Sequence, residues 1–166
     1  MLFRSLETAG ATVVVAQFGQ MEALDGVKRL PEFVAAYHRL LDQFAARTRR
    51  LVLVSPMKFE KPLASHAPDL TRRNADVVAY ANAVRDLARQ RGAAFVDLVG
   101  PPTLRKSARR LTEDGIHLTE AGVHEVAGLI TRQLGAKGNL AASIETLRQA
   151  IVEKNRLWLD CWRPAN

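Results

Sequence analysis

Short apolar runs separated by helical patterns are the feature that most constrains the fold of this chain. The runs ATVVVAQFG, LVLVSP and AAFVDL are rich in apolar and β-branched residues. Continuous apolar runs of this length are typical of strands buried in a parallel sheet. We therefore expect strands near residues 12–18, 51–55 and 94–98, and we expect the first to be buried rather than alternately exposed.

The segments between these runs have the spacing of amphipathic helices. One begins at Pro31, a favoured first helical residue, and a second runs from Asn74 to a capping Gly92. A third begins with Thr119 as the N-cap and ends at Gly135. Alternating strands and helices require right-handed crossovers, so we expect an α/β fold with a parallel sheet and helices on both faces.

Length and composition favour one compact domain. The chain has 166 residues, of which 48% are hydrophobic, enough for a single core. We expect this domain to span residues 1–137 and a helical tail to span residues 138–166. No run of 18 apolar residues and no signal-peptide pattern occurs in the sequence, so we expect no membrane span and leave localisation open.

The formal net charge of +7 invites a nucleic-acid interpretation, because Lys and Arg neutralise phosphates. The basic residues, however, form scattered Arg pairs without interleaved aromatic residues or a known binding motif. We favour a solvated basic surface and expect no nucleic-acid partner. The single cysteine, Cys161, and four histidines without a clear ligand spacing lead us to expect no metal and no cofactor.

The stretch DGIH is the strongest candidate for chemistry. Asp114 and His117 lie three residues apart on a predicted turn between the third strand and the next helix. A carboxylate can hold an imidazole in one tautomer, so that its other nitrogen accepts a proton from a hydroxyl. The alternative is an Asp that caps the turn and a His on the surface. The turn follows the carboxyl end of a parallel strand, where α/β sheets bind ligands, and this favours the catalytic interpretation.

These residues resemble the SGNH (GDSL) hydrolase family of esterases and acylhydrolases. DGIHLTEAG is similar to the family's last block, and VVVAQFG resembles the strand before its Gly-x-Asn block. The resemblance implies a flavodoxin-like three-layer α/β/α fold, here incomplete at the N-terminus, and a serine esterase without a cofactor. It implies His117 as the general base, Asp114 as its orienting partner, and a small ester or acylated glycan as substrate.

The tail KNRLWLDCWRPAN resembles a segment that follows the SGNH domain in bacterial multidomain relatives. In those relatives it leads into further protein. The resemblance also implies that full-length relatives are exported.

Two departures from the family concern the nucleophile and the oxyanion site. The sequence has no Gly-Asp-Ser stretch, and Met21 stands at the position of the family's oxyanion Asn. A thioether cannot donate a hydrogen bond. The backbone N–H of Gly19 and the side chain of Gln20 remain candidate donors, and we interpret Glu22 as a solvated loop carboxylate. Ser5 and Ser55 are the alternative nucleophiles, one in a helix or loop and the other before a proline.

Three hypotheses follow from the sequence. The first is an SGNH hydrolase that keeps the Asp-His pair but lacks the nucleophile strand, and the second is a non-catalytic SGNH-fold binding or interaction module. The third, a basic nucleic-acid-binding domain, is the weakest. If the first strand of the order 2-1-3-4-5 is missing, the strand at 12–18 has an open edge. We expect the chain to self-associate through this edge or to aggregate, unless residues 1–10 or the tail after residue 140 cover it.

Overall fold

The computed structural model describes residues 10–64, 67–101, 110–135 and 142–162 of the chain. The chain divides into two compact units, residues 1–135 and residues 136–166. The domain boundary expected from the sequence remains a prediction.

A parallel sheet of three strands forms the centre of the first unit. Strands β1 (Val14–Gln17), β2 (Leu51–Val54) and β3 (Ala94–Val96) lie in the order β1-β2-β3. The predicted parallel sheet is therefore confirmed, and each observed strand lies within its predicted range.

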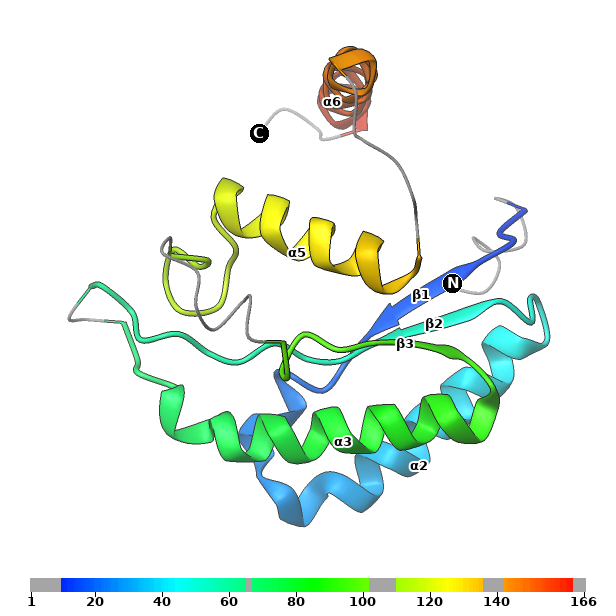
Figure 1. The fold of residues 1–166 in the computed structure, drawn as a ribbon, viewed down its shortest axis with the longest axis vertical. Helices are drawn as coiled ribbons and strands as arrows, with labels where there is room; N and C mark the ends of the chain where they lie inside the picture. Colours follow the sequence, from blue (N-terminus) through cyan, green and yellow to red (C-terminus); the bar gives the residue numbers. More distant parts are fainter. Residues whose placement is uncertain (1–9, 65–66, 102–109, 136–141, 163–166) are drawn as a thin grey trace. The chain divides into compact units, whose positions relative to one another are not determined.

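Helices cover both faces of this sheet, as the alternating pattern predicts. Helices α2 (Leu30–Ala45) and α3 (Asn74–Arg91) lie on one face, and α5 (Glu120–Gln133) lies on the other (Figure 1). The segment before α2 forms two short 3-10 helices, Glu22–Asp25 and Val27–Arg29, and a third, Thr71–Arg73, precedes α3.

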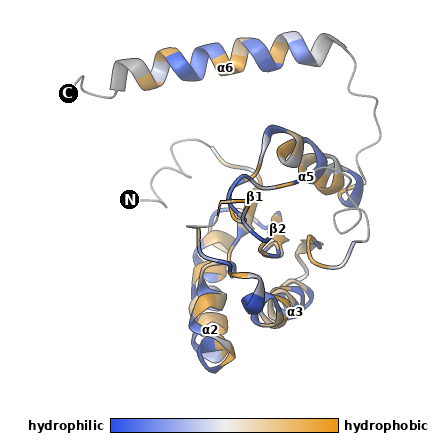
Figure 2. Cartoon of the chain, turned by 90° about the vertical axis from the view of Figure 1, so that its left-hand side faces the viewer, coloured by the Kyte–Doolittle hydropathy of each residue, from blue (hydrophilic) through white to orange (hydrophobic). Residues whose placement is uncertain are grey.

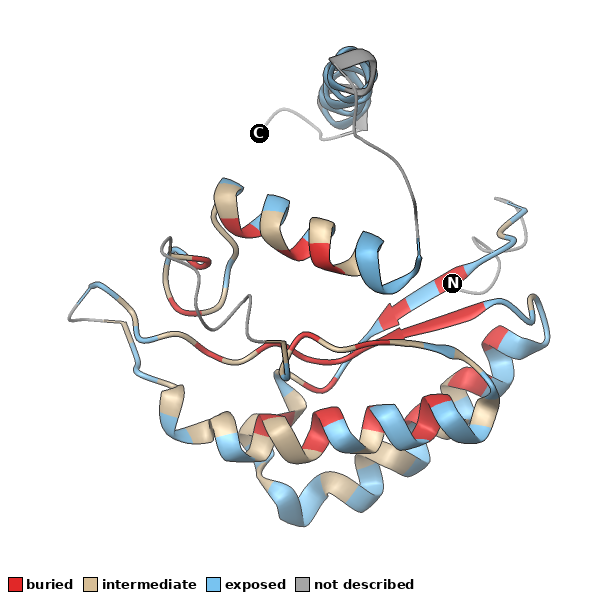
Figure 3. Ribbon diagram, viewed as in Figure 1, coloured by how far each residue is buried: buried red, intermediate tan, exposed pale blue. Residues whose placement is uncertain are grey.

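The core has a main layer on each side of the sheet (Figure 3). The first layer joins β1 and β2 to α2 and α3, through Val14, Ala16, Tyr37, Leu41, Phe44, Leu51, Leu53, Val84, Leu87 and Ala88. The second joins β2 and β3 to α5, through Val52, Val54, Met57, Val96, Leu98, Val126 and Leu129. Strand β2 contributes to both layers, which explains its uninterrupted apolar sequence.

The expectation that the first strand is buried throughout was wrong. Val14 and Ala16 are buried under α2 and α3, but Val13 is 45% exposed and Val15 is 60% exposed. The α5 layer packs on residues of β2 and β3, and β1 pairs only with β2 in the described part of the chain. Among the described residues of the first unit, one face and one edge of β1 are therefore left without a packing or pairing partner.

The second unit contains one long helix, α6 (Ala142–Trp162). Hydrophobic and hydrophilic residues both occur along its length (Figure 2). None of the helices described is both long and apolar enough to cross a bilayer.

Candidate active site

The DGIH segment forms a tight loop between two short extended pieces. Thr112 and Leu118 form an isolated antiparallel bridge, and the N–H of Glu113 donates to the carbonyl of His117 at 2.8 Å. At the tip of the loop, Oδ1 of Asp114 accepts hydrogen bonds from the backbone N–H groups of Ile116 at 2.9 Å and His117 at 2.8 Å. The carboxylate therefore closes the turn, as Asp side chains commonly do.

The second oxygen of the same carboxylate reaches the imidazole. Oδ2 of Asp114 lies 2.7 Å from Nδ1 of His117, which confirms the expectation that the two side chains meet. The Nδ1–H tautomer can donate to this carboxylate, and Nε2 then lacks a proton and can accept one. The His117 side chain is 75% exposed and the Asp114 side chain is 44% exposed, so the pair is open to solvent.

Hydrogen bonds and charge change the acidity of both groups. The backbone N–H of His117, then its side chain, and then the N–H of Ile116 hold the pKa of Asp114 well below its usual range. The hydrogen bond that the imidazole donates to Asp114, followed by the negative charge of that carboxylate, raises the pKa of His117 above its ordinary value. The carboxylate therefore stabilises the protonated imidazole, as a base that must carry a proton briefly requires.

Two glycines let neighbouring segments approach the site closely. Gly115 has φ +98°, and a Cβ at this position would lie 2.4 Å from the carbonyl oxygen of Glu60. Gly122 lies in the first turn of α5, and a Cβ there would lie 2.0 Å from the carbonyl oxygen of Leu111. The side chain of Thr119 caps this helix by accepting from the N–H of Gly122 at 2.9 Å, so the predicted N-cap is confirmed.

The candidate oxyanion donors after β1 are both engaged or buried. The N–H of Gly19 donates to Oε2 of Glu22 at 2.9 Å, so Glu22 is a half-buried cap of the turn and not the solvated carboxylate expected from the sequence. Nε2 of Gln20 is buried and has no hydrogen-bond partner among the described residues. Met21 is 56% exposed. In this conformation the N–H of Gly19 is bonded within its own turn, and the side-chain N–H groups of Gln20 are not exposed to solvent.

Ser55 has a structural role. Its hydroxyl is buried, donates to the carbonyl of Pro56 at 3.0 Å and accepts from the N–H of Leu98 at 2.8 Å. The bond from Leu98 ties the end of β2 to the end of β3, and a hydroxyl with no exposure cannot attack a bound ester. Ser5, the other serine considered, lies outside the described residues.

Asp97, at the same edge of the sheet, is engaged in hydrogen bonds and an ion pair. Its Oδ1 accepts from the N–H groups of Val99 and Gly100, both at 2.9 Å, and its Oδ2 pairs with Arg85 at 2.8 Å. It closes the turn after β3 and links it to α3. No cluster of three or more potential metal ligands occurs within the described part of the chain.

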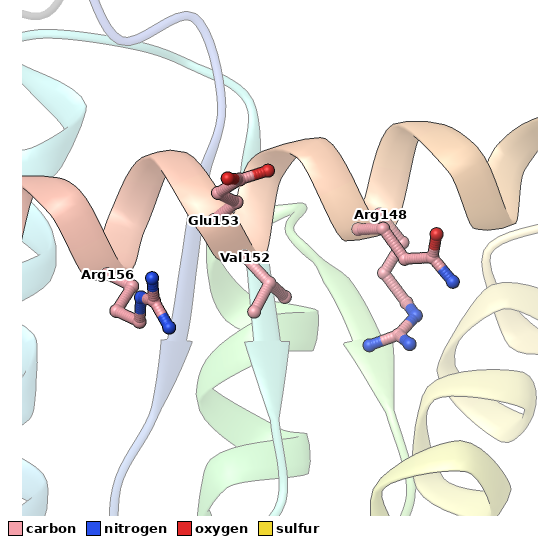
Figure 4. Close-up of a pocket in the computed structure, with 5 residues that line it drawn as sticks. Arg148, Val152, Glu153 and Arg156 are labelled. Atoms are coloured by element: carbon pink, nitrogen blue, oxygen red, sulfur yellow. The ribbon is translucent and has the colours of Figure 1, made fainter.

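Surface hollows occur in both units, and the four that follow do not have Asp114 or His117 in their lining. Three hollows share Glu22: two lie between the segment after β1 and α2, and the third is lined by residues 17–22 alone. A further hollow lies along α6, beside Arg148, Val152, Glu153 and Arg156 (Figure 4). Because its described lining comes from one helix alone, we assign no ligand to it.

The comparisons with known proteins place these features in a family. The family model described as GDSL-like Lipase/Acylhydrolase matches residues 3–124, a segment that includes Asp114 and His117. The curated proteins gave no match.

Solved structures share the fold at low identity. An acetylxylan esterase from Geobacillus stearothermophilus is 17% identical with a TM-score of 0.61, over 81% of this chain and 68% of that chain. An alpha/beta hydrolase enzyme from the metagenome of Lake Arreo, Spain, is 20% identical with a TM-score of 0.60, over 82% and 69%. A gut microbial diltiazem-metabolizing enzyme is 17% identical with a TM-score of 0.55, over 83% and 37%. At these identities the likeness establishes the α/β fold.

Proposed function

Because the chain belongs to the GDSL-like lipase/acylhydrolase family, we propose that its site takes part in ester hydrolysis, with His117 as the general base and Asp114 as its orienting partner. The observation that supports these roles best is the 2.7 Å contact between Nδ1 of His117 and Oδ2 of Asp114. It leaves Nε2 available for proton transfer on an exposed surface.

In this mechanism Nε2 of His117 takes the proton of a hydroxyl nucleophile as its oxygen attacks the ester carbonyl. Asp114 stabilises the imidazolium through the Nδ1–H bond. The imidazolium then gives its proton to the departing alcohol, and an acyl ester remains on the nucleophile. Water attacks this ester with the same imidazole as base, which returns the free hydroxyl and releases the carboxylic acid.

The proposal assigns no nucleophile to this chain. Ser55 is buried and doubly hydrogen-bonded, and the sequence has no Gly-Asp-Ser stretch. The substrate class that we propose is a small ester or an acylated glycan. The name acetylxylan esterase, given to the structural neighbour from Geobacillus stearothermophilus, supports that class.

A pair of assays tests these assignments. Purified chain should hydrolyse p-nitrophenyl acetate no faster than its His117→Ala variant, and a serine-reactive fluorophosphonate should label neither protein. A His117-dependent rate, or a labelled serine, would show that this chain does supply a nucleophile.

The base itself is tested in a chain extended with any in-frame upstream sequence that contains a Gly-Asp-Ser stretch. There the same ester should be hydrolysed, and His117→Ala should lower the rate by about 10³-fold or more. Asp114→Asn should also lower it. An extended chain whose activity is indifferent to His117 would refute the assigned role.

A non-catalytic binding module is the second candidate. It is favoured by Gly19, whose N–H is bonded to Glu22, and by the burial of the Gln20 amide. An active ester hydrolase needs such donors free, because loss of one oxyanion donor costs about 10² to 10³ in rate. Calorimetric binding of acetylated xylo-oligosaccharides that persists in the His117→Ala variant, with no hydrolysis by the extended chain, would support this candidate instead.

A further inference from the structure

The loop after β2 lies directly against the DGIH turn, and Glu60 makes contacts to two parts of it. Oε2 of Glu60 accepts hydrogen bonds from the backbone N–H of Thr112 at 2.9 Å and from the Thr112 hydroxyl at 2.5 Å. The backbone N–H of Glu60 donates to the carbonyl of Gly115 at 3.1 Å. One residue therefore holds both the base of the turn and its tip.

Thr112 transmits this anchoring to the catalytic pair. It is fully buried, and it forms the antiparallel bridge with Leu118 that closes the turn around Asp114 and His117. Without the Glu60 carboxylate, two buried donors of Thr112 would lose their acceptor, and this is costly enough to move the segment. Arg110 also links the two segments. Its Nε donates to the Thr112 carbonyl at 2.8 Å, and its guanidinium also donates to the Lys61 carbonyl.

The Asp114–His117 bond lies on the exposed side of this turn and depends on the position of the backbone beneath it. Two backbone N–H groups orient the Asp114 carboxylate, and both belong to the turn that Glu60 anchors. Gly115 permits the approach, since any side chain there would collide with the Glu60 carbonyl. A shift of the turn therefore changes the geometry of the Asp114–His117 pair directly, without requiring a change in the hydrophobic core.

We propose that Glu60 is a positioning residue of the site, which holds the DGIH turn so that Asp114 keeps His117 in the orientation and tautomer of a general base. The role rests on the proposed function of His117. The contacts of Glu60 do not depend on it. An acceptor at this position, rather than a negative charge, is what the Thr112 donors require.

The test is the pKa of His117, followed by NMR in the whole chain for wild type, Glu60→Gln and Glu60→Ala. Gln keeps an acceptor oxygen and loses the charge. We expect the pKa of His117 to stay above its ordinary value of 6.5 in wild type and Glu60→Gln, and to fall toward 6.5 in Glu60→Ala. The chemical shifts of residues in α5 report whether each variant remains folded.

Two results would overturn the proposal. One is a folded Glu60→Ala variant with an unchanged His117 pKa, and the other is an equal fall in Glu60→Gln, which would assign the effect to charge. If Glu60→Ala does not fold, the Thr112→Val variant tests the proposal instead, because it removes the hydroxyl, one of the two Thr112 donors to Glu60. A lowered His117 pKa in that variant supports the positioning role of Glu60, and an unchanged pKa refutes it. The readout needs no substrate, so it is independent of whether the site hydrolyses esters.

Discussion

At the scale of single residues, the ion pair of the turn gives a pH dependence with a defined sign. Asp114 has a pKa below its ordinary 3.8, so its contribution to folding is present above pH 3.8 and is lost as the pH falls through the folded value. His117 has a pKa above its ordinary 6.5, so its contribution is present below pH 6.5 and is lost as the pH rises through the folded value. The pair therefore contributes most between these two ordinary values.

We predict that Asp114→Asn lowers the pKa of His117 toward 6.5, because the carboxylate is the main cause of the upward shift. The difference in free energy of unfolding between wild type and this variant should be largest from about pH 4 to 6.5 and should shrink on either side. NMR titration and urea unfolding at several pH values measure the two quantities. A His117 pKa that does not respond to the substitution would mean that the pair is not formed in solution.

The contact between Asp114 and His117 could be predicted from the sequence because it is local. Both residues lie in one turn, three positions apart, and no distant segment is needed to bring them together. Glu60 and Thr112 are 52 positions apart, and nothing in the stretch MKFEKP marks the Glu as an anchor. Its only signal was its place in the long loop after an apolar strand. The catalytic roles of Asp114 and His117 remain predictions.

At the scale of elements, α5 carries two glycines that the structure distinguishes sharply. A Cβ on Gly122 would lie 2.0 Å from the backbone oxygen of Leu111, whereas a Cβ on Gly128 would lie 3.3 Å from the end of the flexible Arg132 side chain. The first contact cannot be relieved without moving backbone. The second can be relieved by a rotation of the arginine.

We therefore predict opposite effects from the same substitution in one helix. Gly122→Ala should lower the free energy of unfolding by about 1–3 kcal/mol or more, because it forces α5 away from the segment that leads into the DGIH turn. Gly128→Ala should be neutral or raise it by up to about 1 kcal/mol, since Ala favours the helix. Urea denaturation of the three proteins compares them directly. Equal effects at the two positions would contradict the close approach at Gly122.

The elements themselves were largely predictable, because their signals lie within each segment. Gly92 adopts φ +60° and caps α3, and Thr119 caps α5, as their residue types indicate. Burial of β1 was not predictable in the same way. An apolar run shows that a strand can be buried on both faces, but whether a helix covers each face depends on distant segments, and α5 packs on β2 and β3.

At the scale of the whole molecule, the open side of β1 is the feature with the largest consequence. Residues 11–19 contain no charged side chain, and both Val15 on this strand and Val13 just before it are exposed. Edge strands of native sheets are commonly protected by charges, prolines or bulges, which prevent pairing with another chain. Among the described residues β1 pairs with β2 alone, so its other edge offers backbone groups to a further strand.

We predict that the chain self-associates through this edge, and that Val15→Lys weakens the association because a charge on the edge strand opposes close pairing with an apolar partner. Val123→Lys is the matched control: Val123 is 51% exposed, close to the 60% of Val15, but it lies on α5 and not on the sheet. Size-exclusion chromatography with light scattering over a range of concentrations should show a larger apparent mass for wild type and Val123→Lys than for Val15→Lys.

A wild-type chain that is monomeric at every concentration, with rapidly exchanging amides in β1, would show that the edge is open and yet does not pair. Equal masses for the two lysine variants, both below wild type, would instead attribute the association to general surface hydrophobicity and not to the strand.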